Sequence, residues 1–171
     1  SAATTPPAPA APPASPVQRI VISEVMAGID GNAEYEFVEL YNSTDAVVNL
    51  AGWSLKKKTS SGSETNLVSA AAFVGTIAPK SFFLIAHPAY AGSVSPDLRY
   101  SAASQNLAYT NNAAVLYDAV GAKVDEASWV EIEKGKSMER KAFVGSGCVV
   151  AATDGKYLGN GCDTDAATDF D

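Results

Sequence analysis

Two glutamates, Glu24 and Glu39, lie inside short apolar runs, "VISEV" and "EFVELYN". A pair of carboxylates held about 5–9 Å apart can act as acid and base in the hydrolysis of a glycosidic bond. The alternative is structural, with each carboxylate accepting hydrogen bonds from the backbone or from a basic side chain such as Arg140. We favour the structural interpretation for both glutamates.

The single histidine, His87, precedes Pro88 at the end of a predicted strand. Nucleophilic catalysis would need a serine or cysteine beside it and an acid to orient its ring. The sequence has no G-x-S-x-G motif, which marks the nucleophile of many hydrolases. We therefore predict no catalytic residues and a protein that is not an enzyme.

Acidic residues gather in two stretches, "DGNAEYE" and "DTDAATDFD". Calcium takes roughly six to eight oxygen ligands, and Asp or Asn at alternate loop positions can direct their oxygens to one centre. The EF-hand pattern is not met, and a solvated acidic tail that aids solubility is the alternative. No cofactor is required, and the candidate ligands for Ca²⁺ are Asp163, Asp165, Asp169, Asp171, Asp30 and Asn32.

The two cysteines, Cys148 and Cys162, flank a glycine-rich stretch. We expect a disulfide between them, which would add about 3 kcal/mol by restricting the unfolded chain. A disulfide implies an oxidising compartment. Metal binding is the weaker alternative, because His87 is distant in sequence and no C-x-x-C spacing occurs.

The charge of the chain limits the classes of molecule that it is expected to bind. Its 171 residues carry a formal net charge of −7, which opposes binding to nucleic acid or anionic lipid. The lysines of "LKKK" and "EKGK" are too few for a nucleic-acid face. No apolar run approaches the roughly 18–20 residues that cross a bilayer. The start at Ser1 among small residues and the expected disulfide favour a secreted, cell-surface protein whose signal peptide has been removed.

Residues 1–16, "SAATTPPAPAAPPASP", are low in complexity and rich in proline and alanine. This composition favours an extended, semi-rigid polyproline II arm, with a disordered linker as the alternative. Residues 17–171 would form a single domain with an acidic C-terminal segment. The prolines of the predicted assembly arm are Pro6, Pro7, Pro9, Pro12, Pro13 and Pro16.

From Val17 onward the pattern is that of short strands. Alternation in "EFVELYN" places Val38 and Leu40 on one face and Glu39 on the other. Residues 113–129 read as a hairpin turning at "AVGA", and only 87–92 and 95–99 could hold a helical turn. Strands at this spacing indicate an all-β sandwich or barrel. The other predicted strands are 19–27, 36–42, 47–58, 65–73, 81–87 and 137–141.

Several of these motifs, in order, resemble the lamin tail domain family in its bacterial, secreted form. They are "VISEV", "EFVELYN", "VNLAGWSLK", "IAPKSFFLIA", "NNAAVLYDAVGAKVDEASW" and "KGKSMERK". The resemblance covers roughly residues 19–141 and implies an immunoglobulin-like β-sandwich. It implies no reaction, and a fold alone does not fix a function. It also gives Asn42 the role of a turn residue, which we prefer to the glycan sequon "NST". Trp53 would pack in the core, while Trp129 is less determined.

Two functions from different classes follow. The first is a non-enzymatic, secreted structural protein that assembles with copies of itself through its arm into a filament, sheath or lattice. A low-complexity arm on one domain without a catalytic motif favours it. The alternative is a monomeric binding or adhesion module for a cell-surface glycan, a protein or a calcium-bridged surface. Neither function involves nucleic acid or a transmembrane segment.

Overall fold

The computed structural model describes residues 19–29, 32–144, 147–150 and 159–171. Most of the predicted domain is therefore covered. The arm predicted for residues 1–16 and the candidate ligand Asp30 lie outside the described residues.

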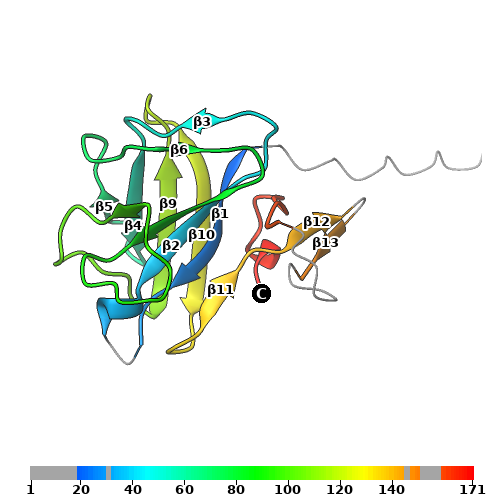
Figure 1. The fold of residues 1–171 in the computed structure, drawn as a ribbon. Helices are drawn as coiled ribbons and strands as arrows, with labels where there is room; N and C mark the ends of the chain where they lie inside the picture. Colours follow the sequence, from blue (N-terminus) through cyan, green and yellow to red (C-terminus); the bar gives the residue numbers. More distant parts are fainter. Residues whose placement is uncertain (1–18, 30–31, 145–146, 151–158) are drawn as a thin grey trace, which may run out of the picture.

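Two β-sheets make up the body of the protein, and their strands are antiparallel except for β8, which is parallel to β7 (Figure 1). The first sheet has five strands in the order β11-β1-β2-β7-β8, and the second has four in the order β10-β9-β4-β5. Strands of the first sheet are β1 (Ile20–Met26), β2 (Phe37–Asn42), β7 (Phe82–Ala86), β8 (Leu98–Arg99) and β11 (Ser137–Glu139). Those of the second are β4 (Ser54–Thr59), β5 (Glu64–Val68), β9 (Thr110–Tyr117) and β10 (Lys123–Glu131). The predicted immunoglobulin-like β-sandwich is confirmed.

Two smaller pairs complete the strands. β3 (Val48–Asn49) pairs with β6 (Thr76–Ile77), and β12 (Ala142–Val144) pairs with β13 (Gly147–Val149). The β12–β13 pair and the C-terminal segment lie beside β1 and β11 (Figure 1). This puts residues beyond the predicted family motifs against the first sheet.

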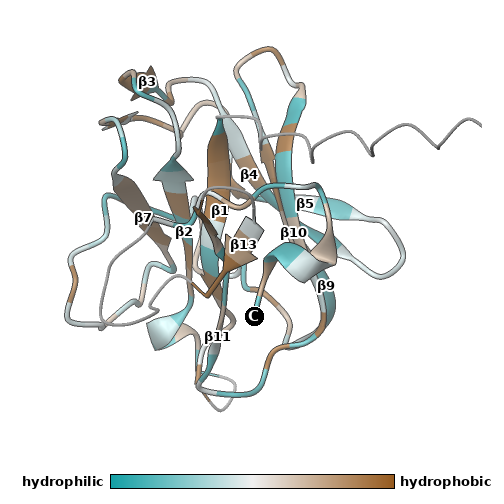
Figure 2. Ribbon diagram, turned by 90° about the vertical axis from the view of Figure 1, so that its right-hand side faces the viewer, coloured by the Kyte–Doolittle hydropathy of each residue, from teal (hydrophilic) through white to brown (hydrophobic). Residues whose placement is uncertain are grey.

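The core between the sheets follows from alternation along the strands. Val38 and Leu40 of β2 are fully buried and pack in the central apolar cluster, while Glu39 between them faces away. Leu55 of β4 and Leu116 of β9 meet this cluster from the other sheet. Figure 2 shows the hydrophobic residues along β1 and β7.

A bulge in β1 separates its two halves. The register with β2 shifts between Ile22 and Glu24, so Ser23 has no partner of its own on β2. Next to the bulge, the Ile22 N–H donates a hydrogen bond to Asp125 Oδ2 of β10, at 2.6 Å. A side chain of the second sheet thus accepts a backbone hydrogen bond from the first sheet.

The β9–β10 hairpin was predicted from "AVGA" and is confirmed. Asp118 Oδ1 accepts hydrogen bonds from the N–H groups of Val120 and Ala122, and Gly121 takes a positive φ of 82°. Such a turn needs an acceptor for its free N–H groups, which Asp118 supplies, and a residue that tolerates positive φ, which Gly121 supplies.

Helix is scarce among the described residues. Two 3₁₀ turns occur, η1 (Ala33–Tyr35) and η3 (Ala167–Asp169). Residues 95–99, one of the two segments that could hold a helical turn, contain β8 instead, because Leu98 and Arg99 pair in parallel with Ile85 and Ala86 of β7. In the part of the chain that the structure describes, no helix is long and apolar enough to cross a membrane.

Candidate functional site

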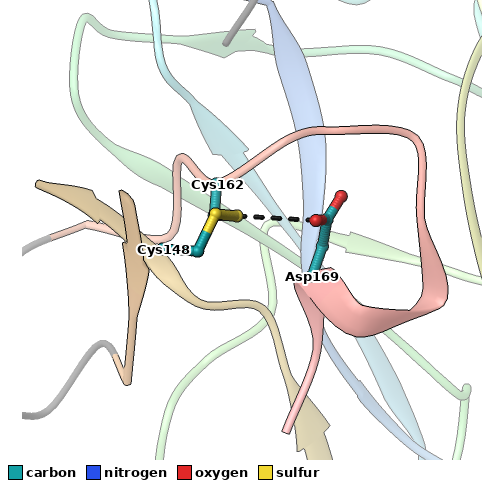
Figure 3. Close-up of side chains that lie close together, drawn as sticks. All are labelled: Cys148, Cys162 and Asp169. Atoms are coloured by element: carbon teal, nitrogen blue, oxygen red, sulfur yellow. Dashed lines mark hydrogen bonds between the residues drawn. A yellow bond between two sulfur atoms is a disulfide. The ribbon is translucent and has the colours of Figure 1, made fainter. Parts of the chain in front are cut away.

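The predicted disulfide between Cys148 and Cys162 is present, with 5.5 Å between the two Cα atoms. It ties β13 to the C-terminal segment (Figure 3). Asp169 Oδ1 lies 3.5 Å from Cys162 Sγ, and together the three residues resemble a metal-ligand group. Both sulfurs are used by the disulfide, so no thiolate is left to hold a metal and the 3.5 Å approach is a contact without a proton.

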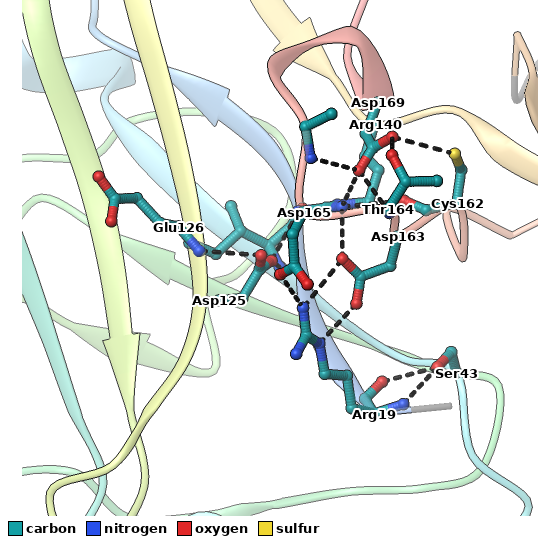
Figure 4. Close-up of polar contacts among 12 residues, drawn as sticks. Arg19, Ser43, Asp125, Glu126, Arg140, Cys162, Asp163, Thr164, Asp165 and Asp169 are labelled. Carbon is teal, nitrogen blue, oxygen red and sulfur yellow. Dashed lines mark hydrogen bonds and ion pairs between the residues drawn. The ribbon is translucent and has the colours of Figure 1, made fainter. Parts of the chain in front are cut away.

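Arg140, directly after β11, is a deeply buried charge, with 1% of its surface exposed. Its guanidinium donates to Asp125 Oδ2 at 2.7 Å and to the carbonyls of Ile22 and Cys162 at 2.7 and 2.8 Å. Asp163 and Asp169 place carboxylate oxygens 3.5 and 3.6 Å from it (Figure 4). We call Arg140, Asp125, Asp163 and Asp169 the Arg140 cluster.

The Arg140 cluster joins three parts of the chain. Asp125 comes from the second sheet, Arg140 follows the first sheet, and Asp163 and Asp169 belong to the C-terminal segment. Asp169 also accepts bonds from the Thr164 N–H and hydroxyl, at 2.7 and 2.6 Å, which shape the end of the chain. A buried charge with this many bonded partners holds its neighbours in one arrangement.

Arg19, at the start of β1, is fixed beside the same segment. Its guanidinium donates to Asp163 Oδ1 at 3.0 Å and to Asp165 Oδ1 at 2.6 Å (Figure 4). Its N–H donates to Ser43 Oγ, and the Ser43 hydroxyl donates to the Arg19 carbonyl. Burial opposes the charge of Arg19, but the bonds to Asp163 and Asp165 outweigh it and raise its pKa. We call Arg19, Ser43, Asp163 and Asp165 the Arg19 anchor.

The candidate calcium ligands have protein partners in this structure. Asp163 and Asp165 pair with Arg19, and Asp169 bonds to the backbone of its own loop and faces Arg140. The acidic tail is partly solvated, because Asp163 and Asp169 are buried while Asp165 and Asp171 are exposed. Asn32 caps η1 through the Glu34 N–H, and the Asp171 backbone pairs with Glu139. Calcium binding stays a prediction.

Glu24 and Glu39 lie directly opposite each other on β1 and β2, and Glu139 of β11 lies on the other side of Glu24. Ser23 Oγ donates to Glu39 Oε1 at 2.8 Å, and Asn160 Nδ2 donates to Glu139 Oε1 at 3.1 Å. The suggestion that Arg140 neutralises Glu24 or Glu39 was wrong, because its guanidinium is taken up by the Arg140 cluster. The bulge at Ser23 and the burial of Arg140 explain the difference.

Burial has a clear electrostatic result on this face. Burial raises the pKa of Glu39 to about 7. The hydrogen bond from Ser23 acts to lower this pKa, while repulsion from Glu24 and Glu139 acts to raise it. Burial and the charge of Glu139 also raise the pKa of Glu24. We call Glu24, Glu39 and Glu139 the glutamate row.

His87 and the tryptophans have structural contacts. His87 Nε2 lies 2.9 Å from the Ala103 carbonyl, and its Nδ1 accepts from the Ala89 N–H at 3.1 Å. Trp53 packs against the core as expected. Trp129 is also buried, and its Nε1 donates to the Ala108 carbonyl at 2.9 Å, so neither offers an open aromatic platform.

Asn42 is confirmed as a turn residue. Its side chain is fully buried, and Nδ2 donates to the carbonyls of Ala46, Ile77 and Ala78 at 2.8, 3.1 and 3.1 Å. A glycan acceptor must be exposed at the surface, which this nitrogen is not.

Sequence reasoning missed two groups of residues. One is the Arg140 cluster, for which a lone arginine within the strand-like stretch "SMERKAF" was a usable signal. The other is a pocket that includes Glu36 and Asn112. Glu36 had been placed in an acidic loop, whereas only 1% of its surface is exposed. No sequence signal marked Asn112, because "NN" also reads as a turn.

Residues 13–131 match the model of a family described as Lamin Tail Domain. No curated protein matches the chain. The matched range ends at β10, so the Arg140 cluster and the disulfide are completed by residues that follow it.

Proposed function

Because the chain belongs to the lamin tail domain family, we propose that it serves as a non-catalytic structural module outside a bacterial cell. In this proposal copies of the protein assemble head to tail through the N-terminal arm. The product is a filament, sheath or lattice at the cell surface. A contact between two different surfaces of the same chain does not close on itself and so extends without limit.

The Arg19 anchor is the observation that carries this proposal. It fixes Arg19, which follows the arm closely in the sequence, through two carboxylates and a two-way hydrogen bond with Ser43. A proline-rich arm keeps its direction over several residues. An arm that starts from a fixed base therefore loses less conformational freedom when it reaches a neighbour.

Export is supported by the disulfide. Disulfides persist mainly in oxidising compartments and are rare in the cytosol. The bond between Cys148 and Cys162 closes the C-terminal segment onto β13. A secreted module benefits from such a cross-link, because it restricts the unfolded chain.

The test compares assembly with and without a stiff arm. In one variant all six arm prolines, Pro6, Pro7, Pro9, Pro12, Pro13 and Pro16, become glycine at unchanged length. In the matched control Ala8, Ala10 and Ala11 become serine and the prolines stay. Electron microscopy and multi-angle light scattering should show polymers for the wild type and the control, and monomers for the glycine variant. Monodisperse monomers of the wild type, with and without calcium, would refute assembly.

The second candidate function is a monomeric binding or adhesion module for a glycan, a protein or a calcium-bridged surface. The pocket that includes Glu36 and Asn112 favours it. Ligand sites in proteins are typically concave and combine apolar walls with a few polar groups.

A further inference from the structure

A pocket of about 320 Å³ opens between the two sheets at one end of the sandwich. Glu36 lies just before β2 of the first sheet, while Lys57 and Thr59 of β4 and Asn112 of β9 come from the second. Leu107 and Tyr109, in the segment that leads into β9, line it as well. The pocket therefore brings together side chains that are distant in sequence.

Asn112 is the first sign that the pocket binds something. Only 7% of its surface is exposed, and its Oδ1 has no hydrogen-bond partner among the described residues. Asn112 lies on the same face of β9 as Ala114 and Leu116, because alternate residues of a strand share a face, and both of those residues belong to the core. An unpaired buried polar atom costs about 1–3 kcal/mol, so a core asparagine of this kind gives the fold no benefit.

Glu36 supplies a second polar group of unusual character. Its Oε1 accepts from the Leu107 N–H at 2.8 Å, and the Tyr100 hydroxyl is buried nearby without making a hydrogen bond of good geometry. Burial raises the pKa of Glu36 to about 8, against the Leu107 N–H and the charge of Lys57. The raised pKa favours the protonated carboxyl group, which can donate a hydrogen bond.

Lys57 and Tyr109 complete the wall. Lys57 Nζ donates to the Asn106 carbonyl at 3.0 Å, and an ammonium group has three N–H donors. The Tyr109 ring lies 5.7 Å from Lys134 Nζ and presents aromatic surface at the same pocket. The pocket thus offers donors, an acceptor and an apolar surface within a small volume.

We propose that this pocket binds one neutral, polyhydroxylated ring, a sugar residue of a surface glycan. Each sugar hydroxyl both donates and accepts, which matches the Asn112 amide on one side and Glu36 and Lys57 on the other. Lys57 disfavours a cation, and among the residues that line the pocket it has no second cationic side chain beside it to hold an anion. The volume lies at the lower end for ligand pockets, which fits a single ring.

The inference deepens the second candidate function and does not depend on assembly. The test uses the full chain labelled with ¹⁵N and titrated separately with glucose, galactose, mannose and N-acetylglucosamine. At least one sugar should give saturable shifts at the Leu107 and Asn112 amides, with a Kd of about 1–10 mM. Light scattering on the same samples reports assembly, so failure of one proposal is distinguished from failure of the other.

Two variants make the test specific. Asn112→Ala should weaken binding at least about 5-fold, because it removes the amide. Asn66→Ala is the matched control, since Asn66 of β5 is exposed and does not line this pocket. Asn112→Ala should also melt within about 2 °C of the wild type, because its Oδ1 contributes no bond to the fold.

Three results would overturn the proposal. They are the absence of saturable shifts with all four sugars, unchanged binding by Asn112→Ala, and a clear loss of stability in that variant. The last would assign Asn112 to the fold rather than to a ligand.

Discussion

At the scale of single residues, the glutamate row sets carboxylates side by side on the outer face of the first sheet. No salt bridge to any of the three is found in the described part of the chain. Folding therefore disfavours the charged form of these carboxyl groups, and the raised pKa values of Glu24 and Glu39 reflect this free-energy cost.

This arrangement predicts a pH dependence of stability. A carboxyl group whose pKa rises from 4.5 unfolded to about 7 folded binds more protons in the folded state over that range. The contribution of Glu39 to stability should therefore fall as pH rises from about 4.5 to 7, with no further loss above that range. Glu36, with a pKa raised to about 8, adds a loss of the same sign that extends to higher pH.

The substitution Glu39→Gln should remove the part of this pH-dependent loss of stability that is due to Glu39. We expect the variant to exceed the wild type by on the order of 1–2 kcal/mol at pH 8, and to match it near pH 4.5. Urea unfolding at pH 4.5, 6.5 and 8 measures this. Glu131→Gln, at an exposed position of β10, is the control and should follow the wild type. An unchanged pH profile for Glu39→Gln would contradict the argument.

Arg140 gives a prediction of the opposite kind. Arg140→Met would leave Asp125 and Asp169 buried without a cation, while Asp163 would keep Arg19. Breaking a buried pair in this way costs about 3–5 kcal/mol. Thermal unfolding should show this loss, while Lys136→Met at an exposed site should change little. A loss below about 1 kcal/mol would mean that the cluster does not hold the C-terminal segment.

At the scale of elements, the C-terminal segment is fastened in two independent ways. The disulfide links Cys162 to β13, and the Arg140 cluster links the same segment to both sheets. The family match ends at residue 131, so this segment adds to a sandwich whose strands are largely complete without it.

Breaking the disulfide should therefore loosen this segment before the sandwich. For the double variant Cys148→Ser and Cys162→Ser we expect a loss of up to about 3 kcal/mol, since the closed loop is short. Hydrogen exchange should quicken in residues 142–144, 147–149 and 159–164, while β2 and β9 stay protected. Peptide mass spectrometry without reductant should show Cys148 linked to Cys162. An equal loss of protection in the sandwich would contradict the claim that the disulfide and the Arg140 cluster hold the C-terminal segment independently.

At the scale of the whole molecule, net charge bears on assembly. Copies that each carry −7 repel one another, and salt screens repulsion between exposed charges over about 10 Å at 0.1 M. Raising sodium chloride from about 20 to 200 mM should therefore favour polymers of the wild type. Light scattering measures the effect, with the proline-to-glycine arm variant as control. Polymers that dissolve in salt would point to a contact held by opposite charges.

Much of the fold could be predicted from the sequence. Alternation in "EFVELYN" and the hairpin around "AVGA" depend on residues within one strand or turn, so local pattern was sufficient. The disulfide followed from two cysteines around a glycine-rich loop. The segment 95–99, which could hold a helical turn, contains β8 instead, because pairing with β7 overrode the local preference.

The candidate sites depended on contacts that the sequence does not display. Arg140 bonds the carbonyl of Ile22, 118 positions away, and Arg19 bonds Asp163, 144 positions away. A one-residue bulge at Ser23 decides which backbone group faces Asp125. Acidic residues that suggested calcium or solvent in the sequence meet arginine in the fold.

The sequence by itself determined the family and the sandwich, because strand alternation and turn chemistry are written in neighbouring residues. Only the tertiary structure decided which charges are neutralised and which are left opposed. Only there did Asn112 become a buried amide without a partner. Burial and charge pairing are properties of surfaces that meet when the two sheets pack, and no local pattern encodes them.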